Sequence, residues 1–287
     1  MNRLPSWFKQ EIPERIVFSR LRLLSEFKLR TVCQEARCPN LSRCFKNSRL
    51  AFIILGENCT RNCRFCAVKK SHAQPLALDL DEPRRIAQAV KELGLNYVVI
   101  TSVTRDDLPD SGAELFARSL ELIHNFNQGI KVEVLIPDFS GNVSSLKTVI
   151  DARPCVMAHN LETVQRLYKE IRPQANYEVS LELLRKIRKL KPGLTTKSAL
   201  MLGLGETEAE VFDAMADLRR VDCDILTLGQ YLAPSAEHYP VKEFIHPQQF
   251  QNYYRMGVGL GFKLVLCGPL VRSSYQAQEV YHEVANV

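Results

Sequence analysis

Three cysteines at a CxxxCxxC spacing constrain this chain more than any other feature. Cys59, Cys63 and Cys66 lie within eight residues, directly after the apolar run 51–55. That run is typical of a short buried strand, and Gly56 ends it. The three thiols are therefore expected on a loop that leaves the C-terminal end of a strand. Thiolates are soft ligands that favour zinc, copper(I) or iron–sulfur clusters, so the loop predicts an inorganic centre.

An iron–sulfur cubane suits this triplet. Each of its four irons needs one outer ligand, so three cysteines leave one iron open. An open iron can chelate a substrate, much as an open zinc position does. Phe65, directly before the last cysteine, adds an apolar face beside the metal. The pattern CxxxCxΦC, in which Φ is aromatic, resembles the signature of the radical S-adenosylmethionine (SAM) enzymes, and this resemblance implies that Phe65 contacts the adenine.

A second cysteine triplet precedes the first. Cys33, Cys38 and Cys44 form a CxxxxCxxxxxC pattern, and the turn residues at 39–40 could fold it around a centre. One strand separates the two triplets. Six thiols at one centre would be too many ligands, so the two spacings predict two separate clusters.

Length and composition allow one large domain or two small ones, with a sizeable core. The chain has 287 residues, a hydrophobic content of 46% and a net charge of +6. It is long enough for one barrel domain, and no apolar run approaches the length of a membrane span. The N-terminus lacks the apolar core of a secretory signal, so we expect a reducing cytoplasm, where clustered cysteines indicate metal before disulfide. The isolated Cys155, Cys223 and Cys267 are expected to be small buried hydrophobic residues.

Alternating apolar and amphipathic segments predict parallel βα units. Strands are expected at 97–102, 131–136, 154–158, 198–202, 225–228 and 263–267. Helices are expected at 14–29, 81–94, 112–126, 142–151, 161–170, 177–190, 207–219 and 247–260, with Asp81 as a cap. This count falls short of a full TIM barrel and predicts a partial (βα)6 TIM-type barrel. We expect an N-terminal extension (1–48), the barrel (49–261) and a C-terminal segment (262–287).

Polar residues occupy strand positions that should be apolar. They predict a polar barrel interior that holds a zwitterionic, hydroxyl-rich ligand such as SAM, or alternatively a structural ion pair between Glu133 and Lys197, or a water network. The residues predicted to bind this cofactor are Phe65, Thr101, Ser102, Glu133, Asn160, Lys197 and Gln230. The glycine-rich stretch 203–207 either brings backbone close to the ligand or starts a helix capped by Thr207.

Taken together, these motifs resemble the lipoyl synthase family across nearly the whole chain. The two cysteine triplets carry this resemblance, together with the stretches 101–107, 133–139, 159–164, 228–232 and Arg272-Ser273-Ser274-Tyr275. The double triplet combined with the Arg-Ser-Ser-Tyr ending is highly specific, because other radical SAM enzymes lack the combination.

The resemblance implies a sulfur-insertion reaction. SAM binds the open iron of the Cys59/Cys63/Cys66 cluster, and its reductive cleavage gives a 5′-deoxyadenosyl radical that takes hydrogen from C6 and C8 of an octanoyl-lysine. The Cys33/Cys38/Cys44 cluster is then the auxiliary 4Fe-4S cluster and gives up its sulfide, with Ser274 as its fourth and more labile ligand. Two SAM molecules are used for each lipoyl group. The catalytic set is thus Cys59, Cys63, Cys66 and Ser274.

The same resemblance implies the partners. They are octanoylated carrier proteins, namely the E2 lipoyl domains of 2-oxoacid dehydrogenases and the glycine cleavage H protein, and an electron donor such as ferredoxin or flavodoxin. The basic surplus fits docking to acidic carriers. Neither nucleic acid nor a membrane is expected as a partner.

The chain departs from the family pattern at two positions. Ala158 stands where an asparagine is usual before His159-Asn160, and Cys155 where an aspartate is commoner. The change at Ala158 removes a polar group close to the expected SAM pocket. The chain is therefore interpreted as a divergent or second-copy member, with a carrier preference that could differ.

Three other functions fit parts of the pattern. A methylthiotransferase-like radical SAM enzyme also uses two clusters, but it would need an RNA-binding domain for which no chain is left. A two-cluster electron carrier would normally hold each cluster with four cysteines and needs no barrel. A structural zinc protein, or a disulfide framework, is the remaining alternative.

Overall fold

The computed structural model describes residues 4–10, 12–70 and 77–285. In that part of the chain, seven parallel strands form one sheet in the order β1-β4-β5-β6-β7-β8-β9. They are β1 (Ala51–Ile54), β4 (Tyr97–Ser102), β5 (Lys131–Leu135), β6 (Val156–Ala158), β7 (Thr195–Leu202), β8 (Ile225–Gln230) and β9 (Leu264–Gly268). A small parallel pair, β2 (Asn58–Cys59) and β3 (Lys69–Lys70), lies in the cysteine loop. The partial barrel expected from the sequence is confirmed.

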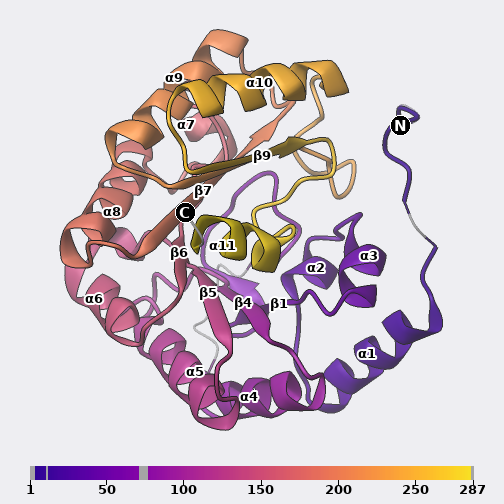
Figure 1. Cartoon of the computed structure of the whole chain (residues 1–287), viewed down its shortest axis with the longest axis vertical. Coiled ribbons are helices and arrows are strands. Elements are labelled where there is room, and N and C mark those ends of the chain that lie inside the picture. Colours follow the sequence, from indigo (N-terminus) through magenta and orange to yellow (C-terminus); the bar gives the residue numbers. More distant parts are fainter. Residues whose placement is uncertain (1–3, 11, 71–76, 286–287) are drawn as a thin grey trace.

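Helices connect the strands and form an outer ring around the sheet (Figure 1). Parallel strands need such crossover connections, and each helix buries one apolar face against the sheet. The ring consists of α4 (Glu82–Glu92), α5 (Ala113–Phe126), α6 (Val143–Asp151), η2 (Gln165–Leu167), α7 (Tyr168–Ile171), α8 (Tyr177–Leu190), α9 (Glu208–Arg220) and α10 (Pro247–Gly259); η1 (Phe139–Gly141) precedes α6. Among the described residues no helix is long and apolar enough to cross a membrane.

The gap between the edge strands β1 and β9 is flanked by both ends of the chain. Helices α2 (Val32–Glu35) and α3 (Leu41–Lys46) lie beside β1, and α1 (Arg15–Glu26) lies at the outer edge next to α4 (Figure 1). Helix α11 (Ala277–Ala285) lies across the middle of the barrel. Val280 and Val284 of α11 form an apolar cluster with the inward-facing Ile225 and Leu264. The C-terminal helix therefore plugs the barrel at the end where the strands begin.

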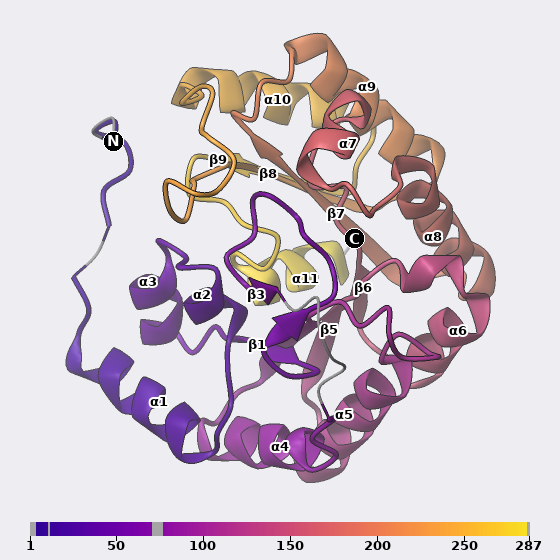
Figure 2. The same cartoon turned by 180° about the vertical axis from the view of Figure 1, so that it is seen from behind.

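The cysteine loop lies at the opposite end of the barrel from α11. It follows the C-terminal end of β1, and Figure 2 shows it in front of the sheet when the molecule is seen from behind. Strand β4 is six residues long, so the two ends of the barrel are about 17 Å apart along the strand. This arrangement places the two cysteine triplets at opposite ends.

Several sequence-based expectations were wrong in detail. The helix expected at 161–170 does not begin until Gln165, because Glu162 has a φ of +68° and makes a parallel bridge to Leu200 instead. Asp81 flanks α4 without a side-chain capping bond and approaches Arg85. Helices α2, α3 and α11 were not expected, and β7 begins three residues earlier than predicted.

Two other expectations concerned cysteines and a glycine-rich turn. Cys223 is buried as predicted, whereas Cys155 and Cys267 are only half-buried. All nine cysteines fall within the described ranges and are free thiols, so no disulfide framework is present. At 203–207 the structure favours the helix start, because Thr207 and Glu210 form a reciprocal capping box at α9.

Gly229 allows the C-terminal segment to approach β8. A Cβ atom on Gly229 would overlap the backbone carbonyl of Val271. The segment that follows, with Arg272 and Ser274, is thus positioned by the absence of a side chain on an inward-facing strand residue.

We expect Gly229→Ala to displace this segment. Because the obstacle is backbone, the variant should lose about 1–3 kcal/mol of unfolding free energy, measured by denaturant titration. Gly259→Ala is the matched control, since a Cβ at Gly259 meets nothing within 4 Å. Equal stability of the two variants would contradict this interpretation.

Candidate active site

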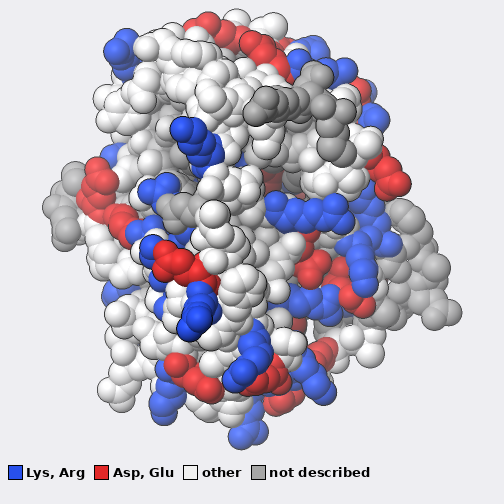
Figure 3. Space-filling view, turned by 90° about the vertical axis from the view of Figure 1, so that its right-hand side faces the viewer, with Lys and Arg blue, Asp and Glu red and all other residues white. Residues whose placement is uncertain are grey.

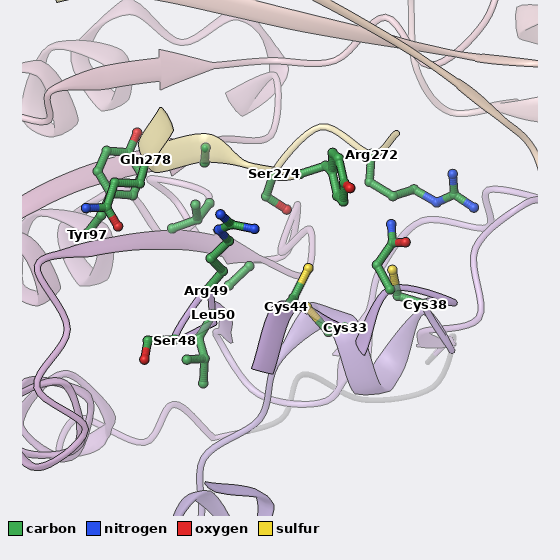
Figure 4. A pocket seen from close by; sticks show the side chains of 15 residues that line it. Cys33, Cys38, Cys44, Ser48, Arg49, Leu50, Tyr97, Arg272, Ser274 and Gln278 are labelled. Atoms are coloured by element: carbon green, nitrogen blue, oxygen red, sulfur yellow. The ribbon is translucent and has the colours of Figure 1, made fainter. Parts of the chain in front are cut away.

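A pocket at the N-terminal end of the barrel joins the two ends of the chain. Cys33, Cys38 and Cys44 line it together with Ser274 and Arg272. Figure 4 shows the thiol of Cys44 and the hydroxyl of Ser274 facing the same space, with Arg272 above Cys38. Helix α2 supplies Cys33, α3 supplies Cys44, and Cys38 lies in the turn between them. The turn before α11 supplies the serine, so residues more than 200 positions apart meet in one site.

The thiols of this pocket lie close enough to affect one another. Burial raises the pKa of Cys33, and its neighbours Cys38 and Cys44 raise that pKa further. Burial likewise raises the pKa of Cys44 to about 11, although the positive charge of Arg49 opposes the shift. Binding of a metal cluster must therefore displace protons from these thiols.

Two contacts between chain ends hold the pocket together. Asn40 Nδ2 donates to the backbone oxygen of Leu270 at 2.5 Å, which ties the start of α3 to the C-terminal segment. Arg49 forms an ion pair with Glu279 of α11. The turn at 39–40, expected from the sequence to shape the triplet, also fixes the opposite end of the chain.

The donor set fits a multinuclear cluster. Among residues 4–10, 12–70 and 77–285, no three His, Cys, Asp or Glu side chains converge closely enough to hold a single metal ion. The thiols of Cys33, Cys38 and Cys44 surround a pocket instead of meeting at one point. A cubane binds each ligand at a different iron, so ligands placed around a space suit it.

The second cysteine triplet is held by backbone amides and by mutual proximity. The backbone N–H groups of Arg61 and Thr104 both donate to Cys59 Sγ at 3.4 Å. Burial raises the pKa of Cys66 to about 12, and Cys63 and Cys59 contribute to this shift. The three thiols therefore lie near one another in the loop that follows β1, at the C-terminal ends of the strands, where parallel barrels bind their ligands.

Arg61, inside the CxxxCxxC loop, fastens the loop to two strands. Its guanidinium donates to both carboxylate oxygens of Asp106, at 2.8 Å, and of Asp138, at 2.6 Å. Asp106 follows β4 and Asp138 follows β5. Burial alone would raise the pKa of Asp138, but the hydrogen bonds from Arg61 outweigh it and hold that pKa at about 2. Bidentate, charge-assisted bonds of this kind fix geometry as well as adding energy.

Several residues predicted to bind the cofactor use their polar atoms within the protein. Glu133 accepts from Lys197 Nζ at 2.9 Å, the ion pair that the sequence left open as an alternative. Thr101 Oγ1 donates to the backbone oxygen of Leu135. Gln230 Nε2 donates to three backbone oxygens, and Gln230 Oε1 accepts from a backbone amide.

Other predicted residues carry unused polar atoms. Ser102 Oγ and Asn160 Oδ1 are buried and have no hydrogen-bond partner within the described part of the chain. His159 Nε2, from the same stretch, is likewise unpartnered. Phe65 is half-buried and packs against the main core. Buried polar atoms without partners are rare, so this end of the barrel can receive a polar ligand.

Sequence reasoning missed Glu162 and Arg172. Both influence the pKa of Cys63, Glu162 raising it and Arg172 lowering it. Burial raises the pKa of Glu162, and Asn160 Nδ2 donates to its carboxylate at 3.0 Å. Arg172 Nε is buried without a partner in the described residues. A positive φ at Glu162 cannot be read from the sequence, and Arg172 lies in a turn between helices. The only sequence signal for either residue is that Glu162 belongs to the stretch 159–164, which carries the family resemblance.

Comparison with known proteins first identifies the superfamily to which this chain belongs. A model described as "Radical SAM superfamily" matches residues 53–218. Solved structures share the fold: methylornithine synthase (PylB) aligns with a TM-score of 0.53 at 12% identity, covering 88% of this chain and 84% of that one. HydG, a maturase of the [FeFe]-hydrogenase, aligns with a TM-score of 0.56 at 14% identity, covering 94% and 74%. The chain belongs to the radical SAM superfamily.

The particular family follows from closer relatives. Residues 1–38 match the N-terminal domain of lipoyl synthase. The lipoyl synthase of Caldanaerobacter subterraneus subsp. tengcongensis is 52% identical, covering 96% of each chain. That of Caldicellulosiruptor bescii is 48% identical over 99% of this chain and 97% of the relative, and that of Thermus thermophilus is 48% identical over 97% and 87%. The chain is a member of the lipoyl synthase family, and this membership implies 4Fe-4S chemistry and SAM.

We expect Arg61→Lys to loosen the cysteine loop. Lysine keeps the charge but cannot make four bonds to two carboxylates, so unfolding free energy should fall by about 2 kcal/mol and hydrogen exchange in residues 57–66 should accelerate. Arg64→Lys is the matched control, because Arg64 is exposed and lies 3.7 Å from Glu170. A loss of the same size in both variants would show that Arg61 has no special role.

The stability of the protein should depend on His159 at mildly acidic pH. Burial, with a contribution from the charge of Arg172, lowers the pKa of His159 to about 4. His159 Nδ1 lies 2.9 Å from the backbone oxygen of Ile136, to which the neutral ring donates. Since an unfolded histidine titrates near 6.5, the unfolded state binds more protons between about pH 6.5 and 4, and unfolding free energy falls as pH is lowered, by up to about 3 kcal/mol.

Denaturant titrations at pH 7 and pH 4.5 check this expectation. The wild type should lose more stability on acidification than His159→Gln, which cannot be charged. Parallel losses in the two proteins would contradict it.

Proposed function

We propose that this chain is a lipoyl synthase in which the two cysteine triplets hold separate 4Fe-4S clusters. The observation that carries the proposal is the pocket shared by Cys33, Cys38, Cys44 and Ser274, at the opposite end of the barrel from Cys59. The family pattern implies that Ser274 is the fourth ligand of this auxiliary cluster, and the proximity of Ser274 to the three thiols supports that assignment.

The clusters supply two kinds of chemistry when bound: one delivers the electron that cleaves SAM to its 5′-deoxyadenosyl radical, and the other donates sulfur to C6 and C8 of a protein-bound octanoyl-lysine. The chain keeps these sites at opposite ends of the barrel, and those ends are about 17 Å apart along β4. The octanoyl chain is proposed to lie in the barrel interior between the two sites, so that C6 and C8 can be reached from both of them.

The residues of the chain hold and orient the reactants. Arg61 fixes the loop of the SAM-binding cysteines against β4 and β5. The carboxylate of Glu162 and the guanidinium of Arg172 offer opposite charges beside Cys63, which suits the amino and carboxylate groups of a methionine. Ser102 and Asn160 offer unused polar atoms to the nucleoside part, and Phe65 an apolar face.

Glu133 and Lys197 were predicted to bind SAM, but they are mutually paired. Thr101 and Gln230 are also engaged with backbone atoms. We propose that these four shape the barrel interior, and that SAM is contacted instead by the charged groups beside Cys63 and by the unpaired polar atoms of Ser102 and Asn160.

The partner in this reaction is proposed to be an octanoylated carrier domain, and the electron donor a small protein such as ferredoxin or flavodoxin. The net charge of +6 favours encounter with an acidic carrier. Figure 3 shows basic and acidic side chains interspersed on the face seen there.

A single-turnover assay tests the function. Anaerobically reconstituted protein is mixed with SAM, a reductant and an octanoyl-lysyl peptide, and the peptide is followed by mass spectrometry. We expect insertion of two sulfur atoms together with formation of 5′-deoxyadenosine. SAM cleavage without any gain of sulfur would overturn the lipoyl synthase assignment and point to another acyl substrate, or to a pocket altered around Ala158.

We expect Glu162→Gln to weaken SAM binding. The change keeps the shape of the side chain and removes the charge offered to the methionine amino group, so the KM for SAM in the cleavage assay should rise about tenfold or more. Glu178→Gln is the control, because Glu178 is exposed and interacts with Gln165. An unchanged KM would exclude Glu162 from SAM binding.

We expect Ser274→Cys to stabilise the auxiliary cluster and to slow sulfur insertion. Thiolate is a softer and stronger ligand for iron than a serine oxygen, so the iron at that corner would be released less readily. SAM cleavage should remain near the wild-type rate while insertion falls at least tenfold. Full insertion by this variant would contradict the role of Ser274 as a labile ligand.

A further inference from the structure

A buried polar network crosses the barrel next to the auxiliary pocket. Tyr97 Oη donates to Glu133 Oε2 at 2.7 Å, and Lys197 Nζ donates to Glu133 Oε1 at 2.9 Å. The Lys197 side chain is 0% exposed and that of Glu133 is 2% exposed. Three inward-facing residues from β4, β5 and β7 thus form one connected unit, in which the carboxylate holds both partners.

Stability alone does not explain this network. Burying two charges costs desolvation energy that their attraction often fails to recover, and apolar replacements of such pairs are frequently neutral or stabilising. A buried pair with every atom matched does fix geometry, however. The geometry fixed here is that of Tyr97, whose hydroxyl is tied to one carboxylate oxygen.

Tyr97 connects this network to the auxiliary pocket. It lines the pocket together with Cys33 and Ser274, and Figure 4 shows it beside Gln278 of α11. Its ring lies 5.8 Å from the ring of Tyr281, also in α11. Tyr97 further shares an apolar cluster with Ala277, the first residue of α11.

These contacts transmit the position of Tyr97 to Ser274. Ala277 and Tyr281 are one helical turn apart on the same face of α11, and both pack against Tyr97 or its neighbours. Ser274 lies three residues before the helix. A shift of the Tyr97 ring therefore moves the start of α11, and with it the turn that carries Ser274.

We propose that Tyr97 is a positioning residue of the auxiliary site, held by Glu133 and Lys197, and that it sets the place of Ser274 through α11. This inference rests on the proposed function, because it takes the Cys33/Cys38/Cys44 pocket as a cluster site. Tyr97 itself does not titrate in this role: burial and the adjacent Glu133 raise its pKa, so the phenol remains a donor.

The test compares two Tyr→Phe variants of the reconstituted holoenzyme. Tyr97→Phe removes the bond to Glu133. Tyr177→Phe is the matched control, since Tyr177 is similarly buried and its hydroxyl donates to Asp217 at 2.9 Å in the outer helix layer. Three quantities are measured: the unfolding midpoint, hydrogen exchange in residues 273–285, and the rate at which a chelator removes iron from the auxiliary cluster.

Both variants should lose similar stability, but only Tyr97→Phe should change the auxiliary site. We expect exchange in residues 273–285 and iron release to accelerate about tenfold, the size expected for loss of one hydrogen bond to a charged group. SAM cleavage at the other cluster should stay near the wild-type rate. A merely structural role would change stability without this selectivity.

A second variant separates the effect of the Glu133 bond on Tyr97 from the effect of Tyr97 on α11. Tyr281→Ala removes the ring on α11 and leaves the Tyr97 network intact, and it should reproduce the selective loss. If Tyr97→Phe matches Tyr177→Phe in exchange and iron release, the inference is overturned, whatever Tyr281→Ala does. If the wild type holds no iron through Cys33, Cys38 and Cys44, the proposed function fails instead.

Discussion

Contact between the two ends of the chain is the constraint on which the rest of the structure depends. A sheet that begins with β1 and ends with β9 leaves an open side, and there the N-terminal helices α2 and α3 meet the C-terminal segment that precedes α11. The bond from Asn40 to Leu270, the Arg49–Glu279 pair and the close approach of Val271 to Gly229 hold them together. Without these contacts the first cysteine triplet would have neither a pocket nor a serine beside it.

The second constraint is the separation of two sites by one barrel. Parallel strands put all their carboxyl ends on one side, so the loop after β1 meets the loops after β4 and β5 there. Arg61 lies where these loops meet and forms ion pairs with both Asp106 and Asp138. The opposite end is covered by α11. In the proposed function, the interior between the two ends is where the octanoyl chain lies.

Much of the fold was predictable, because it depends on local patterns. Alternation of buried strands and amphipathic helices identified the seven strands, and the position of the CxxxCxxC loop followed from the strand before it. Side-chain pairing was not predictable, because it is non-local: Glu133 meets Lys197, 64 residues away, and Gln230 is taken up by backbone atoms up to 28 residues away. Glu162 owes its position to a positive φ, and α2 and α3, with four and six residues, are too short for periodicity to reveal.

The most direct test of the central claim is the iron content of two triple variants, with Mössbauer spectra of each. One replaces Cys33, Cys38 and Cys44 by alanine, and the other replaces Cys59, Cys63 and Cys66. If the triplets form separate sites, each variant should keep half of the wild-type iron, and its spectrum should show one intact 4Fe-4S cluster. Loss of all iron in either variant, or of none, would contradict the two-site account.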